Sequence, residues 1–156
     1  ARVEAWGGDL PPLFVKLAPD LEEGAQEEMA AVAMEAEIDG LILINTTLDR
    51  PAELPERFRA QAGGLSGQPL ADKSLGVISN FYRLTGGKMP IIGVGGVSNG
   101  AQAYAKIRAG ACLVQLYSAL VFQGPFVALK INKELAALLS ADGYENIADA
   151  VGAAHG

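Results

Sequence analysis

The chain has 156 residues, half of them apolar, and its 12 basic and 18 acidic side chains give a formal net charge of −6. This length suits one domain with a core of its own. The basic residues are scattered rather than clustered, which argues against nucleic acid as a partner. The single cysteine excludes an internal disulfide, and no apolar run reaches the ~18–20 residues that cross a bilayer. Residues 1–8 match neither a signal peptide nor a transit peptide and start abruptly, as a fragment would. With one cysteine, nothing suggests an oxidising compartment, so we expect a cytosolic or cytosolic-facing protein.

Four short apolar runs predict strands over residues 13–17, 40–44, 90–94 and 113–117. Each run is nearly continuous in apolar character, which is typical of parallel strands covered on both faces. Between them, Asp20 and Glu23 predict a capping box for a first helix. The predicted buried positions of that helix are Ala25, Met29, Val32, Ala33 and Ala36. Later helices are predicted over 73–84, 102–109, from Pro125 to near Gly143, and as a short tail over 147–151.

The order of these elements, βαβαβαβα, predicts a parallel α/β sheet with right-handed crossovers. A closed TIM (β/α)8-type barrel takes ~200–250 residues, so four βα units amount to a half-barrel. A small doubly wound sheet is the open alternative. The long connection from 46 to 72 contains the glycine-rich run 63–67, which predicts an ordered loop pressed against its surroundings.

A glycine-rich turn over 92–100 lies between the third strand and its helix. Backbone N–H groups at a helix N-terminus bind phosphate well, and tight packing of the strand on the helix is the plain alternative. Tyr117 and Ser118 end the next strand, one βα unit later. The loops after the last two strands of a TIM barrel commonly share one phosphate site, so phosphate binding is favoured if these are those strands.

Lys16 interrupts an apolar strand near its C-terminal end, where barrel active sites lie. A buried lysine is costly unless it meets an anion or takes part in chemistry. The alternatives are a lysine that extends to the strand end or pairs with Asp20. After the second strand, Asn45-Thr46-Thr47 suits a substrate with carbonyl, amide or carboxylate groups, although Asn and Thr also form turns.

Two other potentially reactive side chains, His155 and Cys112, give no reason to expect catalysis. His155 stands alone near the C-terminus, which gives a histidine-based triad no support. Cys112 is expected to be a small core residue. No cluster of Cys, His and carboxylates has ligand spacing, so no metal is expected.

Five motifs, at 15–20, 45–47, 63–67, 91–97 and 113–118, stand in a characteristic order and spacing. Together they resemble class 2 dihydroorotate dehydrogenase, and the resemblance extends over nearly the whole chain from Pro12. It implies that residues 1–156 form the C-terminal half of an FMN-binding barrel. The complete protein would oxidise dihydroorotate to orotate in pyrimidine biosynthesis and pass the electrons to a membrane quinone.

The resemblance also implies roles for single residues. Lys16 would hydrogen-bond the pyrimidine edge of the flavin, where a fixed cation favours reduction. The other expected FMN contacts are Ile44, Gly67, Gly96, Tyr117 and Ser118, the last three around the phosphate through backbone N–H groups. Asn45 and Thr46 would bind the dihydroorotate ring. Ile44 stands where the family usually has threonine, so a backbone contact survives this change and a hydroxyl contact does not.

No catalytic residue is expected within the chain, because the family's general base, a serine, lies upstream of Ala1, as do the helices that admit quinone. The isolated chain is therefore expected to be inactive. A half-barrel leaves unpaired edges and an apolar face, so it needs its N-terminal half, another copy or a companion chain. The complete protein is expected on the cytoplasmic side of the inner membrane as a peripheral protein. The alternatives are a non-catalytic half-barrel that holds FMN or another phosphorylated ligand, and a different phosphate-binding barrel enzyme.

Overall fold

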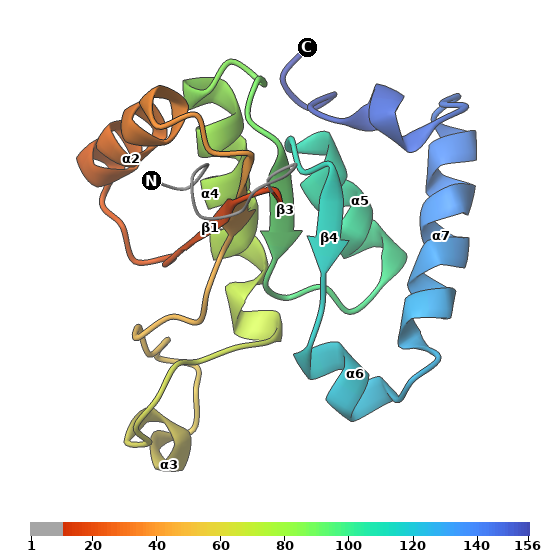
Figure 1. The fold of residues 1–156 in the computed structure, drawn as a ribbon. Coiled ribbons are helices and arrows are strands. Elements are labelled where there is room, and N and C mark those ends of the chain that lie inside the picture. The colour runs from red at the N-terminus through yellow and green to blue at the C-terminus, as the bar shows by residue number, and fades with distance from the viewer. Residues whose placement is uncertain (1–10) are drawn as a thin grey trace.

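The computed structural model describes residues 11–156, so the N-terminal stretch 1–8 noted above lies outside the described residues. A parallel sheet of four strands forms the centre, in the spatial order β1-β2-β3-β4 (Figure 1). The strands are β1 (Phe14–Leu17), β2 (Gly40–Leu43), β3 (Ile91–Val94) and β4 (Leu113–Gln115), which confirms the four predicted strands with slightly shorter bounds. In register, Lys16 lies beside Ile42 and Ile42 beside Ile92.

Four long helices connect and cover the strands, namely α2 (Glu23–Glu35), α4 (Ala71–Leu84), α5 (Gly100–Arg108) and α7 (Val127–Ala141). Consecutive helices pack on one another, α2 on α4, α4 on α5 and α5 on α7, and form one layer behind the sheet (Figure 1). A doubly wound sheet reverses its strand order and carries helices on both faces. The sequential order and the single helix layer therefore confirm four consecutive βα units of a TIM-type barrel.

Shorter elements complete the chain: α3 (Glu56–Arg59), η1 (Gln68–Leu70), α6 (Ser118–Gln123) and η2 (Ile147–Ala150). The sequence predicted η2 as a helical tail and missed the other three. Pro125 was predicted in the first turn of the last helix, but α7 begins at Val127 with Phe126 as its N-cap. The physical reason is α6, which takes up residues 118–123 and turns the chain at Gly124 (φ 82°) before α7 starts.

The core lies between the sheet and the helix layer. Its largest fully buried members include Leu41, Leu43, Ile78, Phe81 and Ile91, from β2, α4 and β3. The inner strands are thus apolar because helices cover them, as predicted. The prediction of burial on both faces is wrong for the outer strands, where Val15 is 36% and Leu113 60% exposed, because no described segment covers the far face of the sheet at its edges.

The start of α2 differs from the predicted capping box. The N-cap is Glu22, without a side-chain capping bond, because the Asp20 carboxylate is used by Thr47, Leu48 and Lys73 instead. The predicted buried face of α2 is also wrong in part. Its buried residues are Ala30 and Ala33, whereas Met29 is 40% and Val32 52% exposed.

Candidate functional site

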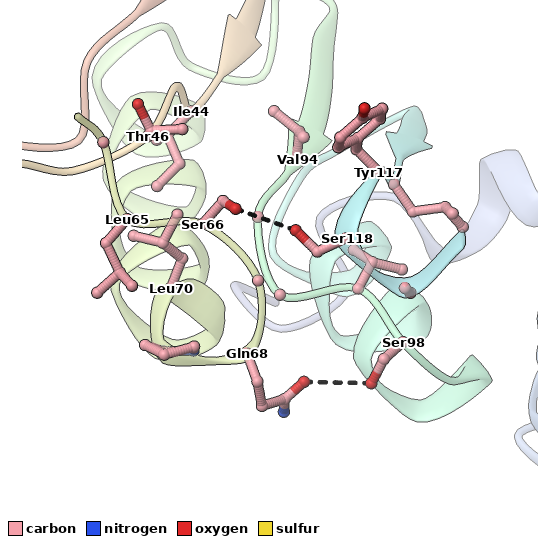
Figure 2. Close-up of a pocket in the computed structure, with 18 of the residues that line it drawn as sticks. Ile44, Thr46, Leu65, Ser66, Gln68, Leu70, Val94, Ser98, Tyr117 and Ser118 are labelled. Carbon is pink, nitrogen blue, oxygen red and sulfur yellow. Dashed lines mark hydrogen bonds between the residues drawn. The ribbon is translucent and has the colours of Figure 1, made fainter. Parts of the chain in front are cut away.

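The carboxyl ends of the strands open into a cavity of about 790 Å³. This volume lies in the range of small-molecule and cofactor sites. All eight site residues expected from the sequence line it: Lys16, Ile44, Asn45, Thr46, Gly67, Gly96, Tyr117 and Ser118. Figure 2 shows the cavity between the strand ends and the glycine-rich loop, with Val94 above it and Ser66 and Ser118 facing each other. Residues from all four βα units are therefore brought together at one edge of the sheet.

The glycine turn after β3 lies directly against the start of α4. Gly95 and Gly96 have φ angles of 109° and 70°, a region that side chains other than glycine rarely adopt. A Cβ atom on Gly96 would lie 2.5 Å from the Cα atom of Ala71. Only glycine fits this turn, which leaves its backbone accessible to the cavity.

The N-terminus of α5 itself is already used within the protein, in contrast to the helix-terminus site that the sequence favoured. The side chain of Asn99 caps α5 by accepting from the Gln102 amide at 2.9 Å. The Gly100 amide donates to Glu134 Oε2 at 2.6 Å. An anion in the cavity would therefore meet the Gly95-Gly96 turn rather than the first turn of the helix.

The loop 63–67 is ordered and pressed against two strand ends, as its glycines predicted. Its Leu65 pairs with Thr47 through two backbone hydrogen bonds of 2.8 and 3.1 Å. A Cβ atom on Gly64 would overlap the Thr46 side chain, and Gly67 (φ 82°) would meet the Cβ atom of Ser118 at 3.3 Å. The Ser66 and Ser118 hydroxyls are 3.1 Å apart, so the loop reaches across to the end of β4 (Figure 2).

One arginine that the sequence analysis did not single out holds this loop together. The Arg50 guanidinium donates to the carbonyls of Thr47, Leu48 and Asp49 on one side of the loop and to those of Gln61 and Gly63 on the other. A guanidinium has five N–H donors in a rigid fork. No local pattern marks such a residue, because the carbonyls that define its role come together only when the loop folds.

A polar network at the base of the loop was also missed. Asp20 accepts from the Thr47 hydroxyl at 2.5 Å, from the Leu48 amide at 2.9 Å and from the Lys73 ammonium at 2.5 Å. Lys73 also pairs with Asp49. Burial raises the pKa of Asp20, but the hydrogen bonds from Lys73, Thr47 and Leu48 outweigh it and lower the pKa to about 2. For Lys73 burial lowers the pKa, and its bonds to Asp20 and Asp49 outweigh it, so the pKa is raised.

Lys16 does not pair with Asp20, which was one reading of the sequence, because Lys73 takes that carboxylate. Lys16 lines the cavity and is exposed to it rather than buried in the strand. Among residues 11–156, it is the only charged side chain that lines the cavity. The cavity therefore has one cation in its lining, at the end of β1, together with uncharged polar and apolar residues.

The residues after β2 are fixed mainly by their backbone. Ile44 is 1% exposed, and its amide donates to the Val94 carbonyl at 3.2 Å. The Asn45 amide donates to the Leu17 carbonyl at 2.8 Å, and its side-chain oxygen accepts from the Thr46 amide at 3.0 Å. These bonds hold the expected substrate residues at the rim between β1 and β3.

His155 and Cys112 lie away from the cavity. The His155 ring stacks on Tyr82 at 5.0 Å between centroids, and its Nε2 is 3.1 Å from the Ala109 carbonyl. The Cys112 thiol donates to the Ile91 carbonyl at 3.3 Å. Within residues 11–156 no group of three metal-ligating side chains is gathered, and no helix of that part has the length and apolar character to cross a membrane.

Comparison with known proteins places this arrangement in a family. Residues 5–139 match the family model described as dihydroorotate dehydrogenase. The dihydroorotate dehydrogenase (quinone) of Xanthobacter autotrophicus is 55% identical over 141 residues, which cover 90% of this chain and 40% of that protein. The mitochondrial dihydroorotate dehydrogenase (quinone) of Mus musculus is 51% identical over 149 residues, covering 96% of this chain and 38% of that protein. A crystal structure of DHODH from Eimeria tenella in complex with ferulenol matches with a TM-score of 0.91 and 42% identity, over 95% of this chain and 39% of that chain.

The sheet order and the cavity at the carboxyl ends of the strands define a barrel-type α/β protein whose site lies at the strand ends. The chain belongs to the dihydroorotate dehydrogenase family. The resemblance drawn from the five sequence motifs is thereby confirmed. The chain spans about 40% of the length of the curated relatives it matches, and it corresponds to their C-terminal part.

Proposed function

We propose that the complete protein oxidises dihydroorotate to orotate with FMN and passes the electrons to a quinone, and that this chain supplies the flavin-holding part. The observation that carries the proposal is the convergence of Lys16, the Gly95-Gly96 turn and the Tyr117–Ser118 segment on one cavity. A cavity of about 790 Å³ suits a flavin nucleotide, and the turn that excludes a Cβ atom at Gly96 suits close approach of a phosphate.

We assign a role to each of the eight expected site residues. Lys16 holds a positive charge at the pyrimidine edge of the flavin, where negative charge develops on reduction. Gly96, Tyr117 and Ser118 bind the phosphate through their backbone amides, and Gly67 and Ile44 approach the flavin with their backbone. The amide and hydroxyl groups of Asn45 and Thr46 orient the dihydroorotate ring. Bound FMN supplies the hydride acceptor.

The proton that leaves dihydroorotate needs a base, and the described lining offers no carboxylate and no histidine. The resemblance to the family implies that this base is a serine outside this chain, upstream of Ala1. The same observation favours the second candidate, a half-barrel that binds FMN without turnover. The complete protein would work as a peripheral protein at the cytoplasmic side of the inner membrane, where it meets its quinone.

An anaerobic flavin spectrum separates the two candidates. The protein at its full encoded length is expected to carry the visible absorption of FMN and to bleach when dihydroorotate is added. Colour without bleaching would favour the binding module, and a colourless protein would refute both. Lys16→Met is expected to slow bleaching at least tenfold, whereas Lys88→Met removes an exposed lysine outside the cavity and serves as the charge control.

We also propose that the exposed edge and apolar face of this half-barrel are covered by its N-terminal half, another copy or a companion chain. At the end of the sheet formed by β4 and α6, Tyr117 is 76%, Val121 65% and Phe122 87% exposed. Exposed apolar side chains beside a strand edge that no described strand pairs favour association, although Tyr117 and Phe122 also line the cavity. Sedimentation of the isolated chain is expected to show aggregates or oligomers, and a compact stable monomer would refute this part of the proposal.

A further inference from the structure

Lys106 is the most deeply buried charged side chain among residues 11–156, and the site described above does not use it. It points inward from α5 and is 2% exposed. Burial lowers its pKa to about 8, with the Asp72 carboxylate opposing this effect from a distance. No ion pair compensates it in the described part of the chain. A buried cation without a paired anion is costly, so its contacts need an explanation.

The contacts of Lys106 lead to the end of β3. Its ammonium donates to the Ser74 hydroxyl at 2.8 Å, and this hydroxyl in turn donates to the Val94 carbonyl at 2.6 Å. Val94 is the last residue of β3, immediately before the Gly95-Gly96 turn, and its carbonyl also accepts from the Ile44 amide at 3.2 Å. The carbonyl at the root of the turn is therefore held from two sides.

The Gly95-Gly96 turn also packs against Ala71 and Ser74, the two residues whose oxygen atoms accept hydrogen bonds from Lys106. A second, longer bond of 3.4 Å joins the Lys106 ammonium to the Ala71 carbonyl. A Cβ atom on Gly96 would lie 2.5 Å from Ala71, and one on Gly95 would lie 3.3 Å from Ser74. The Lys106 stem passes beneath the preceding strand residue, 3.4 Å from where a Cβ atom of Gly93 would stand. Lys106 thus bonds to the first turn of α4, on which the glycine turn packs, and reaches the end of β3 through Ser74.

We propose that Lys106 is a positioning residue for the phosphate turn: through Ser74 and Ala71 it fixes the Gly95-Gly96 backbone for an anion and adds a buried positive charge behind it. The inference rests on the proposed flavin site. Stability alone does not account for the lysine, since replacement of buried charged groups by apolar residues of similar size is often neutral or stabilising. We therefore assign the buried lysine to the anion site rather than to the stability of the core.

The test compares two flavins that differ only in the phosphate. The flavin-free protein at its full encoded length is titrated with FMN and with riboflavin at pH 7, with quenching of flavin fluorescence as the readout. Lys106→Met is expected to weaken FMN binding roughly tenfold and riboflavin binding less than about twofold. Lys133→Met, which removes an exposed lysine of α7 outside the cavity, is expected to change neither.

Ser74→Ala provides a second variant if Lys106→Met does not fold. It removes the hydroxyl between the ammonium and Val94, so it is expected to weaken FMN binding in the same selective way, and the double variant is expected to show less than the sum of both effects. Equal losses for FMN and riboflavin, or no loss in either variant, would overturn the positioning role. A wild-type protein that binds no FMN would overturn the proposed function and this inference with it.

Discussion

Gly96→Ala tests whether the glycine turn is built for close approach. Gly96 has a φ angle of 70°, and a Cβ atom there would stand 2.5 Å from the Ala71 Cα atom and 2.7 Å from its backbone nitrogen. Alanine in the left-handed region costs ~1–2 kcal/mol. Because the atoms it meets belong to the backbone of α4, they cannot rotate away, and overpacking of this kind adds ~1–3 kcal/mol.

The expected total is therefore a loss of ~2–5 kcal/mol of unfolding free energy, or a displaced turn with a corresponding loss of FMN affinity. Denaturant unfolding of the flavin-free protein and titration with FMN measure the two outcomes separately. Either result agrees with the packing of the turn on α4, because the added methyl group must move one of the two segments.

Gly143→Ala is the matched control. Gly143 has a similar φ angle of 80°, but a Cβ atom there would meet nothing within 4 Å. Its cost is expected to be the backbone term alone, ~1–2 kcal/mol, with FMN binding unchanged. If Gly96→Ala loses no more stability than Gly143→Ala and still binds FMN as tightly as the wild type, the turn is not packed as described and our reasoning is wrong.

Three further predictions concern charged side chains. Asp20 has its pKa lowered to about 2, so its stabilising effect is complete above about pH 4 and is lost as the pH falls towards 2. Asp20→Asn should therefore cost ~1 kcal/mol at pH 7, reduced for solvent screening, and only a small fraction of that at pH 2, by denaturant unfolding. Burial lowers the pKa of Lys106 to about 8, against an opposing effect of Asp72, so the unfolded chain binds more protons between about pH 8 and 10.5 and stability rises with pH there. The wild type should gain ~1.5 kcal/mol from pH 8 to pH 9.5, and an equal gain in Lys106→Met would contradict the assignment. Arg50→Lys should speed hydrogen exchange of the loop 47–63 and its cleavage by proteases, because a lysine cannot serve carbonyls on both sides of the loop; Arg57→Lys, which changes an arginine resting on Phe58, should leave the loop protected.

The strand positions and the helix order could be predicted from the chain alone, and the residues expected at the site line one cavity. The apolar runs at 40–44 and 90–94 predicted β2 and β3 because these strands are buried under helices and had to be apolar throughout. In a parallel sheet all carboxyl ends meet at one edge, so residues at the strand ends were bound to converge. Lys16 and Gly96 therefore line one cavity although 80 positions separate them.

Other features depended on contacts between distant segments. The sequence predicted that Asp20 caps a helix. In the fold its carboxylate instead accepts hydrogen bonds from Lys73 and Thr47. Met29 and Val32 fitted a helical stripe, yet in α2, which packs on α4, the buried residues are Ala30 and Ala33. Local patterns state which conformation a segment favours, and they do not state which partner will occupy its polar groups.

The sequence by itself determined the parallel α/β order and the glycine-rich turns, because these follow from backbone preferences within short segments. It also carried the resemblance to the family in five motifs spread along the chain. Only the tertiary structure decided that Arg50 binds both sides of the loop and that Lys106 bonds to the residues on which the Gly95-Gly96 turn packs. Both side chains are long and flexible, so their roles are set by the acceptors that folding brings within reach.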